Sequence, residues 1–85
     1  MREDKIMRTV RCRNDRKPGT LGNLVLAITE QGGEVGEIRL IQESLGAVIR
    51  EITIYFDDEA QLEQVLAVMS ANPGTRILAV LDEVL

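Results

Sequence analysis

Apolar and polar residues alternate along residues 5–13, and this period of two is typical of a strand with one buried face. The alternation places Ile6, Val10 and Cys12 on one face and polar residues on the other. We expect this first strand to end near Arg13, with its apolar face packed against the core.

Two later segments have the spacing of amphipathic helices, with apolar residues at i, i+3, i+4 and i+7. The first begins near Thr20 and ends at Gly32 and Gly33, because glycine adopts the left-handed cap conformation at little cost. The second follows Asp58, a side chain that can cap a helix start, and ends before Pro73. The two apolar stripes are Leu21, Leu24, Val25 and Ile28, and Leu62, Val65, Leu66 and Met69.

Three more segments are strand-like. Residues 35–42 and 48–56 flank Gly46, which suits a hairpin turn. Residues 76–84 are apolar at consecutive positions, so we expect both faces of the last strand to be buried. In the third strand, the residues that share one face are Val48, Ile52, Ile54 and Phe56.

The predicted order is βαββαβ, in which each half is a βαβ unit. Right-handed crossovers place both helices on one face of a four-stranded antiparallel sheet, so the fold class is α+β and ferredoxin-like. We expect residues 1–85 to form a single domain. The predicted core comprises Val10, Leu21, Leu24, Val25, Ile28, Ile38, Leu40, Ile52, Ile54, Leu62, Val65, Leu66 and Met69.

The composition is that of a small globular domain, with 45% apolar and 28% charged residues in a chain of 85. The sequence contains no apolar run of the roughly 18 residues that a transmembrane helix needs, and its first residues are too charged for a signal peptide. We therefore expect a cytoplasmic protein with no membrane partner. A domain of this size buries roughly 60% of its unfolded surface and gains stability from a partner.

Few residues suit catalysis or metal binding. The chain has no histidine, and Cys12 is its only cysteine, so we expect no catalytic residue, no metal site and no cofactor. Cys12 is interpreted as a small buried hydrophobe. The carboxylate pair Asp57 and Asp58 lies where a helix needs a cap, although two carboxylates converging in a cleft would indicate a small enzyme.

The charge is strongly one-sided. Seven of the ten basic residues lie in the first 17 positions, which favours an alternative function as a nucleic-acid-binding module that uses the first strand. Arg11 and Arg13, however, share a predicted sheet face with Glu51, and a ladder of opposite charges explains them without a ligand. Tyr55 and Phe56 are adjacent and face opposite ways, so they form no stacking platform. With a net charge of −4, we expect no nucleic acid partner.

The segment "RNDRKPGTLG" joins the first strand to the first helix. A helix start presents unpaired amides that favour a small anion, and Gly19 lets a ligand approach the backbone closely. Gly22 leaves a second gap one turn later, and Arg13, Arg16 and Lys17 attract anions. In the alternative interpretation the proline and glycine only make a turn, as at residues 73–75, and Gly22 allows close packing of the helix on the sheet.

The stretches "RKPGTLGNLVLAITEQGGEVGEI", "REITIYFDDEAQLEQVLAVM" and "NPGTRILAVLDEVL" resemble an ACT domain over residues 6–85. The narrower resemblance is to the N-terminal ACT domain of bacterial NAD-dependent malic enzymes. ACT domains are regulatory modules that pair, often into one continuous sheet, and bind a small effector between two copies. The resemblance therefore implies a non-catalytic domain that forms a homodimer or higher oligomer, binds an amino acid or carboxylate metabolite, and controls an attached metabolic enzyme.

The same resemblance implies the site. The turn of one copy supplies Asp15, Pro18, Gly19, Thr20 and Leu21, and the partner copy supplies residues 33–38, including Glu34. Glu34 replaces an asparagine that is frequent in the family, and its charge would repel an effector's carboxylate and attract its amine. Arg16 stands where the family usually has another polar residue. Some ACT domains only pair subunits, and that alternative remains open.

Pairing would also bury apolar strand edges that are an aggregation hazard when exposed. The last strand and the "IRLI" of the second strand are both apolar enough to pair with a symmetric copy. Because the chain begins with Met1 and stops within an apolar run, we expect an N-terminal piece of a larger enzyme.

Overall fold

Six elements follow one another in the computed structural model, which describes residues 4–81. They are β1 (Ile6–Asp15), α1 (Thr20–Glu30), β2 (Glu34–Glu43), β3 (Ala47–Phe56), α2 (Glu59–Ala71) and β4 (Thr75–Leu81). The predicted βαββαβ order and the ferredoxin-like fold class are confirmed.

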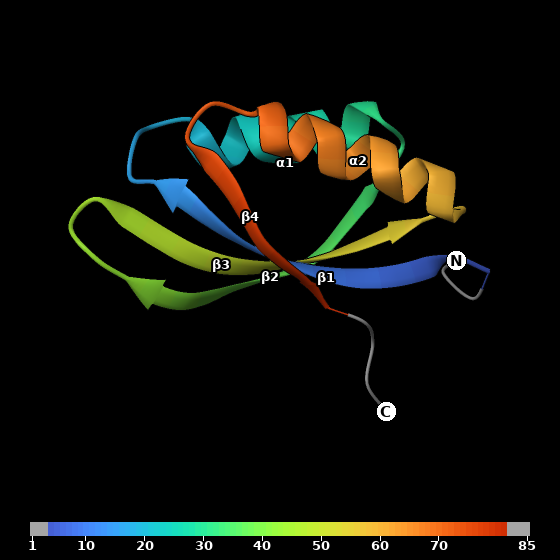
Figure 1. Ribbon diagram of the computed structural model, residues 1–85, viewed down its shortest axis with the longest axis horizontal. Helices are drawn as coiled ribbons and strands as arrows, with labels where there is room; N and C mark the ends of the chain where they lie inside the picture. The colour runs from blue at the N-terminus through green and yellow to red at the C-terminus, as the bar shows by residue number, and fades with distance from the viewer. Residues whose placement is uncertain (1–3, 82–85) are drawn as a thin grey trace.

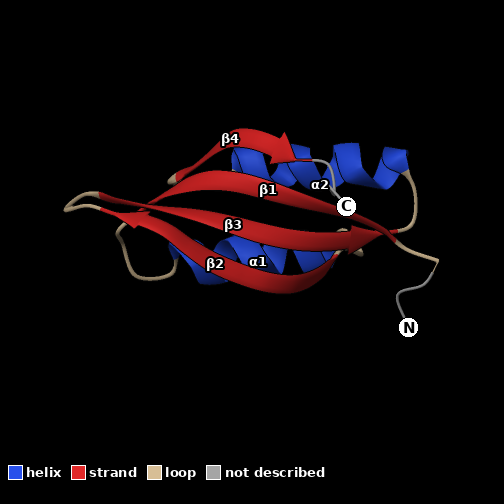
Figure 2. Ribbon diagram, turned by 90° about the horizontal axis from the view of Figure 1, so that it is seen from below, coloured by secondary structure: helices blue, strands red, loops and turns tan. Residues whose placement is uncertain are grey.

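The strands form one antiparallel sheet in the order β2-β3-β1-β4. Both helices cover the same face (Figure 1), and the other face is open to solvent, as the view from below shows (Figure 2). The two edges of the sheet are therefore β2 and β4. Among the described residues, no helix is long and apolar enough to cross a membrane.

The core lies between the helices and the covered face of the sheet. β1 and β3 are the central strands, so their covered-face side chains are the most completely buried, and each helix adds the buried residues of its apolar stripe. Leu21, Val25 and Leu66 are only partly buried at its margin. The core cluster comprises Val10, Cys12, Leu24, Ile28, Ile52, Ile54, Phe56, Leu62, Val65 and Met69.

The edge strand β2 departs from the prediction. Ile38 and Leu40 were expected in the core, but they are 39% and 60% exposed. Both pair with covered-face positions of β3, so they point toward the helix layer. They remain exposed because β2 is the outermost strand and α1 does not extend over them.

The other edge strand, β4, is also more exposed than predicted. Its burial alternates along the strand, and Leu78 and Val80 are 43% and 40% exposed. The pairing with β1 skips Leu78, which makes a bulge, while Ile77 packs against the core. The prediction that both faces of this strand are buried was wrong for residues 76–81, because an edge strand lacks a neighbour and the open face has no covering layer. Residues 82–84 of that prediction lie outside the described part.

Local signals at the element ends behave largely as expected. β1 continues beyond the predicted end at Arg13, because Asn14 and Asp15 pair with the start of β3. The carboxylate of Asp58 accepts a hydrogen bond of 2.8 Å from the Gln61 amide, which confirms the predicted helix cap. Gly32 takes the left-handed conformation, with φ of 85°, just after α1.

Candidate functional site

The turn from β1 to α1 needs glycine at its centre. Gly19 is the N-cap of α1 with φ of 89°, a left-handed conformation that a residue with a Cβ adopts at a cost. No side chain caps this helix start, and the first turn closes through a 2.8 Å bond from the Asn23 amide to the Gly19 carbonyl. Among the described residues, the backbone N–H groups of Leu21 and Gly22 have no backbone acceptor.

Two neighbouring turns hold this segment in place. The Asp15 amide donates to the Gly74 carbonyl at 2.8 Å, in the connection between α2 and β4. The Arg16 amide donates to the Gly46 carbonyl at 3.2 Å, in the hairpin between β2 and β3. The segment is thus fixed at both sides, and α1 begins at a defined place beside the sheet.

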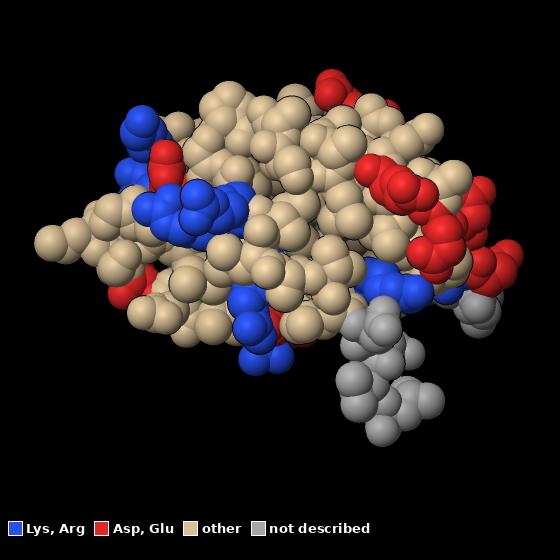
Figure 3. All heavy atoms as spheres, in the orientation of Figure 1, with Lys and Arg blue, Asp and Glu red and all other residues tan. Residues whose placement is uncertain are grey.

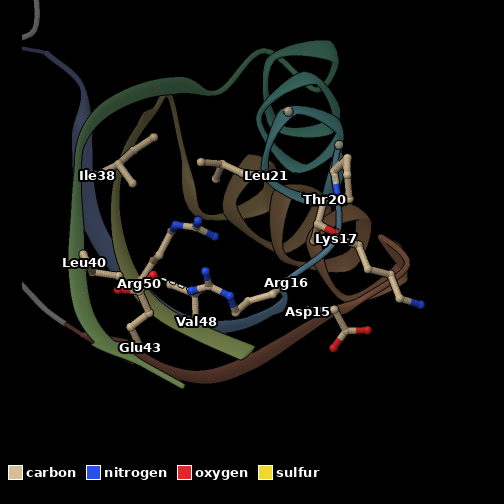
Figure 4. Close-up of a pocket in the computed structure, with 13 residues that line it drawn as sticks. Asp15, Arg16, Lys17, Thr20, Leu21, Ile38, Leu40, Glu43, Val48 and Arg50 are labelled. Atoms are coloured by element: carbon tan, nitrogen blue, oxygen red, sulfur yellow. Dashed lines mark hydrogen bonds and ion pairs between the residues drawn. The ribbon is translucent and has the colours of Figure 1, made fainter. Parts of the chain in front are cut away.

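A cavity of about 570 Å³ opens between this turn and the outer part of the sheet. The close-up in Figure 4 shows Leu21 and Ile38 on one side, Leu40, Glu43 and Val48 on the other, and two arginines between them. The volume lies within the range of about 300–1,000 Å³ that small-molecule sites occupy.

Five of the six residues assigned from the ACT resemblance line this cavity: Asp15, Pro18, Gly19, Thr20 and Leu21. Glu34 does not line it. It begins β2 opposite Tyr55, whereas the cavity meets β2 farther along, from Ile38 to Glu43. A role for Glu34 from a partner copy stays a prediction.

Gly22 also lines the cavity, and a Cβ at this position would meet no atom within 4 Å. The interpretation that this glycine allows α1 to pack closely on the sheet was therefore wrong, because nothing lies close to it. Gly22 leaves open space at the mouth of the cavity instead.

Two guanidinium groups point into the cavity, those of Arg16 from the turn and Arg50 from β3 (Figure 4). Arg16 forms an ion pair with Glu43 at the end of β2. Arg50 donates from Nη1 to Oδ1 of Asn14 at 2.8 Å. The side chains of Asp15 and Lys17 point away from the centre (Figure 4).

Arg50 was not among the site residues predicted from sequence, although a signal was present. In β3 the covered face carries Val48, Ile52, Ile54 and Phe56, and Arg50 occupies the same phase of the alternation. A charged residue in the apolar phase of a strand needs a reason, since burying an uncompensated charge is costly. Asn14 presents the same signal in β1, where it follows Val10 and Cys12 on the covered face and is completely buried.

Asn14 connects Arg50 to a buried polar network. Its Nδ2 donates to Oγ1 of Thr75 at 3.0 Å, and Asn72 Nδ2 donates to the same oxygen at 2.9 Å. Asn72 also donates to the Thr20 carbonyl at 3.3 Å, at the start of α1. No buried side-chain nitrogen or oxygen of the described residues lacks a partner. The network fixes the Arg50 side chain from behind.

The basic residues of β1 are matched by acids of the same chain. Arg11 forms an ion pair with Glu51 at 2.6 Å on the open face, as the charge ladder predicts, and Arg13 pairs with Asp15 at 2.9 Å. Lys5 pairs with Asp57 at 2.6 Å, and this hydrogen bond raises the pKa of Lys5. In Figure 3, acidic side chains gather over the end of the molecule where α2 begins, and basic ones cluster around the end of β1. These pairs favour the charge ladder over a nucleic-acid surface.

The acids around the start of α2 have structural partners. Asp57 pairs with Lys5, Asp58 caps α2, and Glu59 pairs with Arg8 at 3.1 Å. Within residues 4–81 there is no group of three or more histidine, cysteine or acidic residues that could hold a metal ion. The solvated and capping roles of these acids account for their positions.

Comparison with known proteins places the fold. The structure is similar to the ACT domain of a GTP pyrophosphokinase from Chlorobium tepidum, with a TM-score of 0.73 and 14% identity over 91% of this chain and 99% of that one. It is also similar to the de novo designed protein Foldit4, with a TM-score of 0.55 and 14% identity over 94% and 99% of the two chains. The protein therefore has the fold of an ACT domain, and the predicted resemblance is confirmed at this level.

In sequence, the chain is 35% identical over 81 residues to NAD-dependent malic enzyme 1 of Bacillus subtilis strain 168. The match covers 94% of this chain but only 18% of the enzyme, so the chain corresponds to a small part of it. The predicted resemblance to a malic enzyme is thereby confirmed. No protein-family model matches the chain.

Proposed function

We propose that this protein is a regulatory domain that binds a small effector in the cavity beside Gly19 and controls an attached catalytic domain. The cavity is the observation that carries the proposal, because it lies at the turn where the resemblance to ACT domains implies an effector site. The similarity to a short part of a malic enzyme supports an NAD-dependent malic enzyme as the attached partner. Cytoplasmic localisation is part of the same proposal.

The proposal includes a homodimer formed through the edge of β2. This strand is exposed over almost its whole length and presents Ile38, Leu40 and Ile41 at 39%, 60% and 40% exposure. An edge strand also carries unpaired backbone groups, which a second copy would satisfy by extending the sheet. Since Ile38 and Leu40 border the cavity, a copy docked here would cover its open side. The edge of β4, with Leu78 and Val80 exposed, is the alternative.

Effector binding is tested by filling the cavity. Gly22 lies in the helix with no atom near its Cβ position, so Gly22→Leu adds a side chain at the cavity mouth without backbone strain. We expect calorimetric titration with amino acids and with small carboxylic acids to detect a ligand for the wild type and none for the variant. The matched control is Asn23→Leu, because Asn23 is exposed on the same turn and does not line this cavity. If no such compound binds the wild type, the effector role is wrong and a pairing-only role is left.

Pairing through β2 is tested with Ile41→Lys, which places a charge on the edge outside the cavity. Sedimentation should show a dimer for the wild type and a monomer for this variant. Leu26→Lys is the control, since Leu26 is 55% exposed on α1. A dimer that survives Ile41→Lys and dissociates with Val80→Lys would assign the interface to β4 instead.

A further inference from the structure

We propose that Arg50 binds the carboxylate of the effector and that the effector is a small organic acid without an amino group. This inference rests on the proposed function, because it assumes that the cavity binds a ligand. It goes further because it names the residue that anchors the ligand and chooses a carboxylic acid over an amino acid.

Arg50 carries a charge that the described residues do not neutralise. It is partly buried, lines the cavity and forms no ion pair within residues 4–81. The other two basic side chains of the cavity differ from it, because Arg16 pairs with Glu43 and Lys17 points outward. A partly buried cation beside an open cavity favours an anion in that cavity.

The guanidinium has donors left for such an anion. Within residues 4–81 its one hydrogen bond goes from Nη1 to Oδ1 of Asn14, and arginine has five N–H donors in a fixed fork. A planar fork of this kind matches the two oxygens of a carboxylate. Because completely buried Asn14 is itself held by Thr75, the fork is oriented before a ligand arrives.

The start of α1 adds to this attraction. The N–H groups of Leu21 and Gly22, which lack backbone acceptors among the described residues, lie at the same cavity. They favour negative charge in the ligand, although the inference depends on Arg50.

Within a single copy, the cavity offers little to an ammonium group. Its two acidic side chains are Asp15 and Glu43, and both already form ion pairs, with Arg13 and Arg16 respectively. Asp15 also points away from the centre (Figure 4). The remaining wall includes the apolar side chains of Leu21, Ile38 and Val48, which suit a short hydrocarbon skeleton. An organic acid therefore fits these groups better than the amino acid of the same skeleton.

Succinate and aspartate form a matched pair of probes, because they differ only by the amino group. We expect calorimetric titration of the 85-residue chain to show that succinate binds more tightly than aspartate. Arg50→Gln should weaken succinate binding about 10- to 100-fold, the loss that charge-assisted hydrogen bonds predict. Arg50→Lys should bind succinate with an affinity between those of the wild type and Arg50→Gln, since lysine keeps the charge but lacks the fork. The control is Arg76→Gln, because Arg76 is exposed on β4 and lines no part of the cavity.

The possible outcomes separate the two proposals. Binding of either probe that is unchanged in Arg50→Gln overturns the role of Arg50 and leaves the effector site in place. Aspartate binding that equals or exceeds succinate binding overturns the choice of ligand class. If neither these probes nor other amino acids and carboxylic acids bind the wild type, both proposals fail.

A second measurement does not depend on the folding of a variant. In ¹H–¹⁵N spectra of the wild type, succinate should shift the Arg50 Nε–H signal together with the Leu21 and Gly22 amide signals. Shifts confined to other parts of the molecule would overturn the inference. Inorganic phosphate serves as a third probe, and binding of phosphate that excludes succinate would assign the guanidinium to a phosphate group instead.

Discussion

At the residue scale, Gly19 and Gly22 have opposite reasons for being glycine. Gly19 has φ of 89°, so its backbone conformation requires the absence of a Cβ. Gly22 lies within α1, where glycine only adds conformational entropy to the unfolded chain. The two residues are three positions apart, and yet only the first is a structural requirement.

This difference predicts opposite effects of one substitution. Gly19→Ala should lower the free energy of unfolding by about 1–2 kcal/mol, since a left-handed residue with a Cβ is strained. Gly22→Ala should leave it unchanged or raise it by up to about 1 kcal/mol. Chemical denaturation of both variants measures the difference. Equal destabilisation by the two substitutions would contradict the left-handed conformation at Gly19.

Cys12 gives the protein a pH dependence at alkaline pH. Burial raises the pKa of the Cys12 thiol, an effect that nearby Arg50 and the hydrogen bond to Asn14 only partly offset. In the unfolded chain the thiol ionises near its ordinary pKa of about 8.5, while in the folded protein it stays neutral to higher pH. This contribution to stability is therefore complete below the unfolded pKa and is lost as the pH rises toward the folded one.

The test compares the wild type with Cys12→Ala. The free energy of unfolding of the wild type should fall more steeply between about pH 8 and about pH 10 than that of the variant. Urea denaturation across this range measures both slopes, and the variant removes only the thiol's contribution. Identical slopes would mean that burial does not perturb this thiol.

Residue-level signals could be predicted from sequence where they are local. The cap at Asp58 and the buried position of Cys12 follow from spacing alone, and both agree with the structure. Arg50 and Asn14 were overlooked, although each stands in the apolar phase of its strand. A polar residue in the apolar phase of a strand is itself the signal, because it marks a polar site on an otherwise apolar face.

At the scale of elements, α1 has a sharply divided surface. Leu24 is completely buried, while Leu26, two residues later, is 55% exposed. The apolar spacing of the helix predicts this division, because residues at i and i+2 point in different directions. The same spacing does not reveal how far the helix extends over β2, which explains why Ile38 and Leu40 were wrongly assigned to the core.

The division predicts the cost of shortening each leucine. Leu24→Ala should lower the free energy of unfolding by about 2–5 kcal/mol, since it removes buried methyl groups and leaves a cavity. Leu26→Ala should change it by less than about 0.5 kcal/mol. Thermal and urea denaturation of the two variants provide the comparison. If Leu26→Ala lowers the free energy of unfolding strongly in a dimer, this face of α1 is covered by another copy.

At the scale of the whole molecule, the order of elements was enough to predict the fold. The cavity could be predicted only in part. The turn beside Gly19 was identified from sequence, and the opposite walls from β2 and β3 were not, because which residues face one another depends on the sheet order. The two edges of the sheet, β2 and β4, are exposed in a single copy. A second copy that covered either edge would therefore add to the stability of the protein.

If copies pair, the melting temperature must depend on concentration. Mass action favours the dimer as protein is added, so the melting temperature should rise with protein concentration in the wild type and stay constant in Ile41→Lys. Scanning calorimetry over a hundredfold range of concentration measures this. A constant melting temperature in the wild type, together with a monomeric mass, would contradict pairing.

The hydrogen bonds behind Arg50 have a consequence for communication across the sheet. Asn14 and Thr75 join this arginine to the beginning of β4, and Asn72 extends the connection to the end of α2 and to Thr20. An anion that displaces the guanidinium would therefore alter a chain of hydrogen bonds that leads from the cavity to β4. Binding in the cavity would in this way change the geometry of the sheet edge that lies opposite β2.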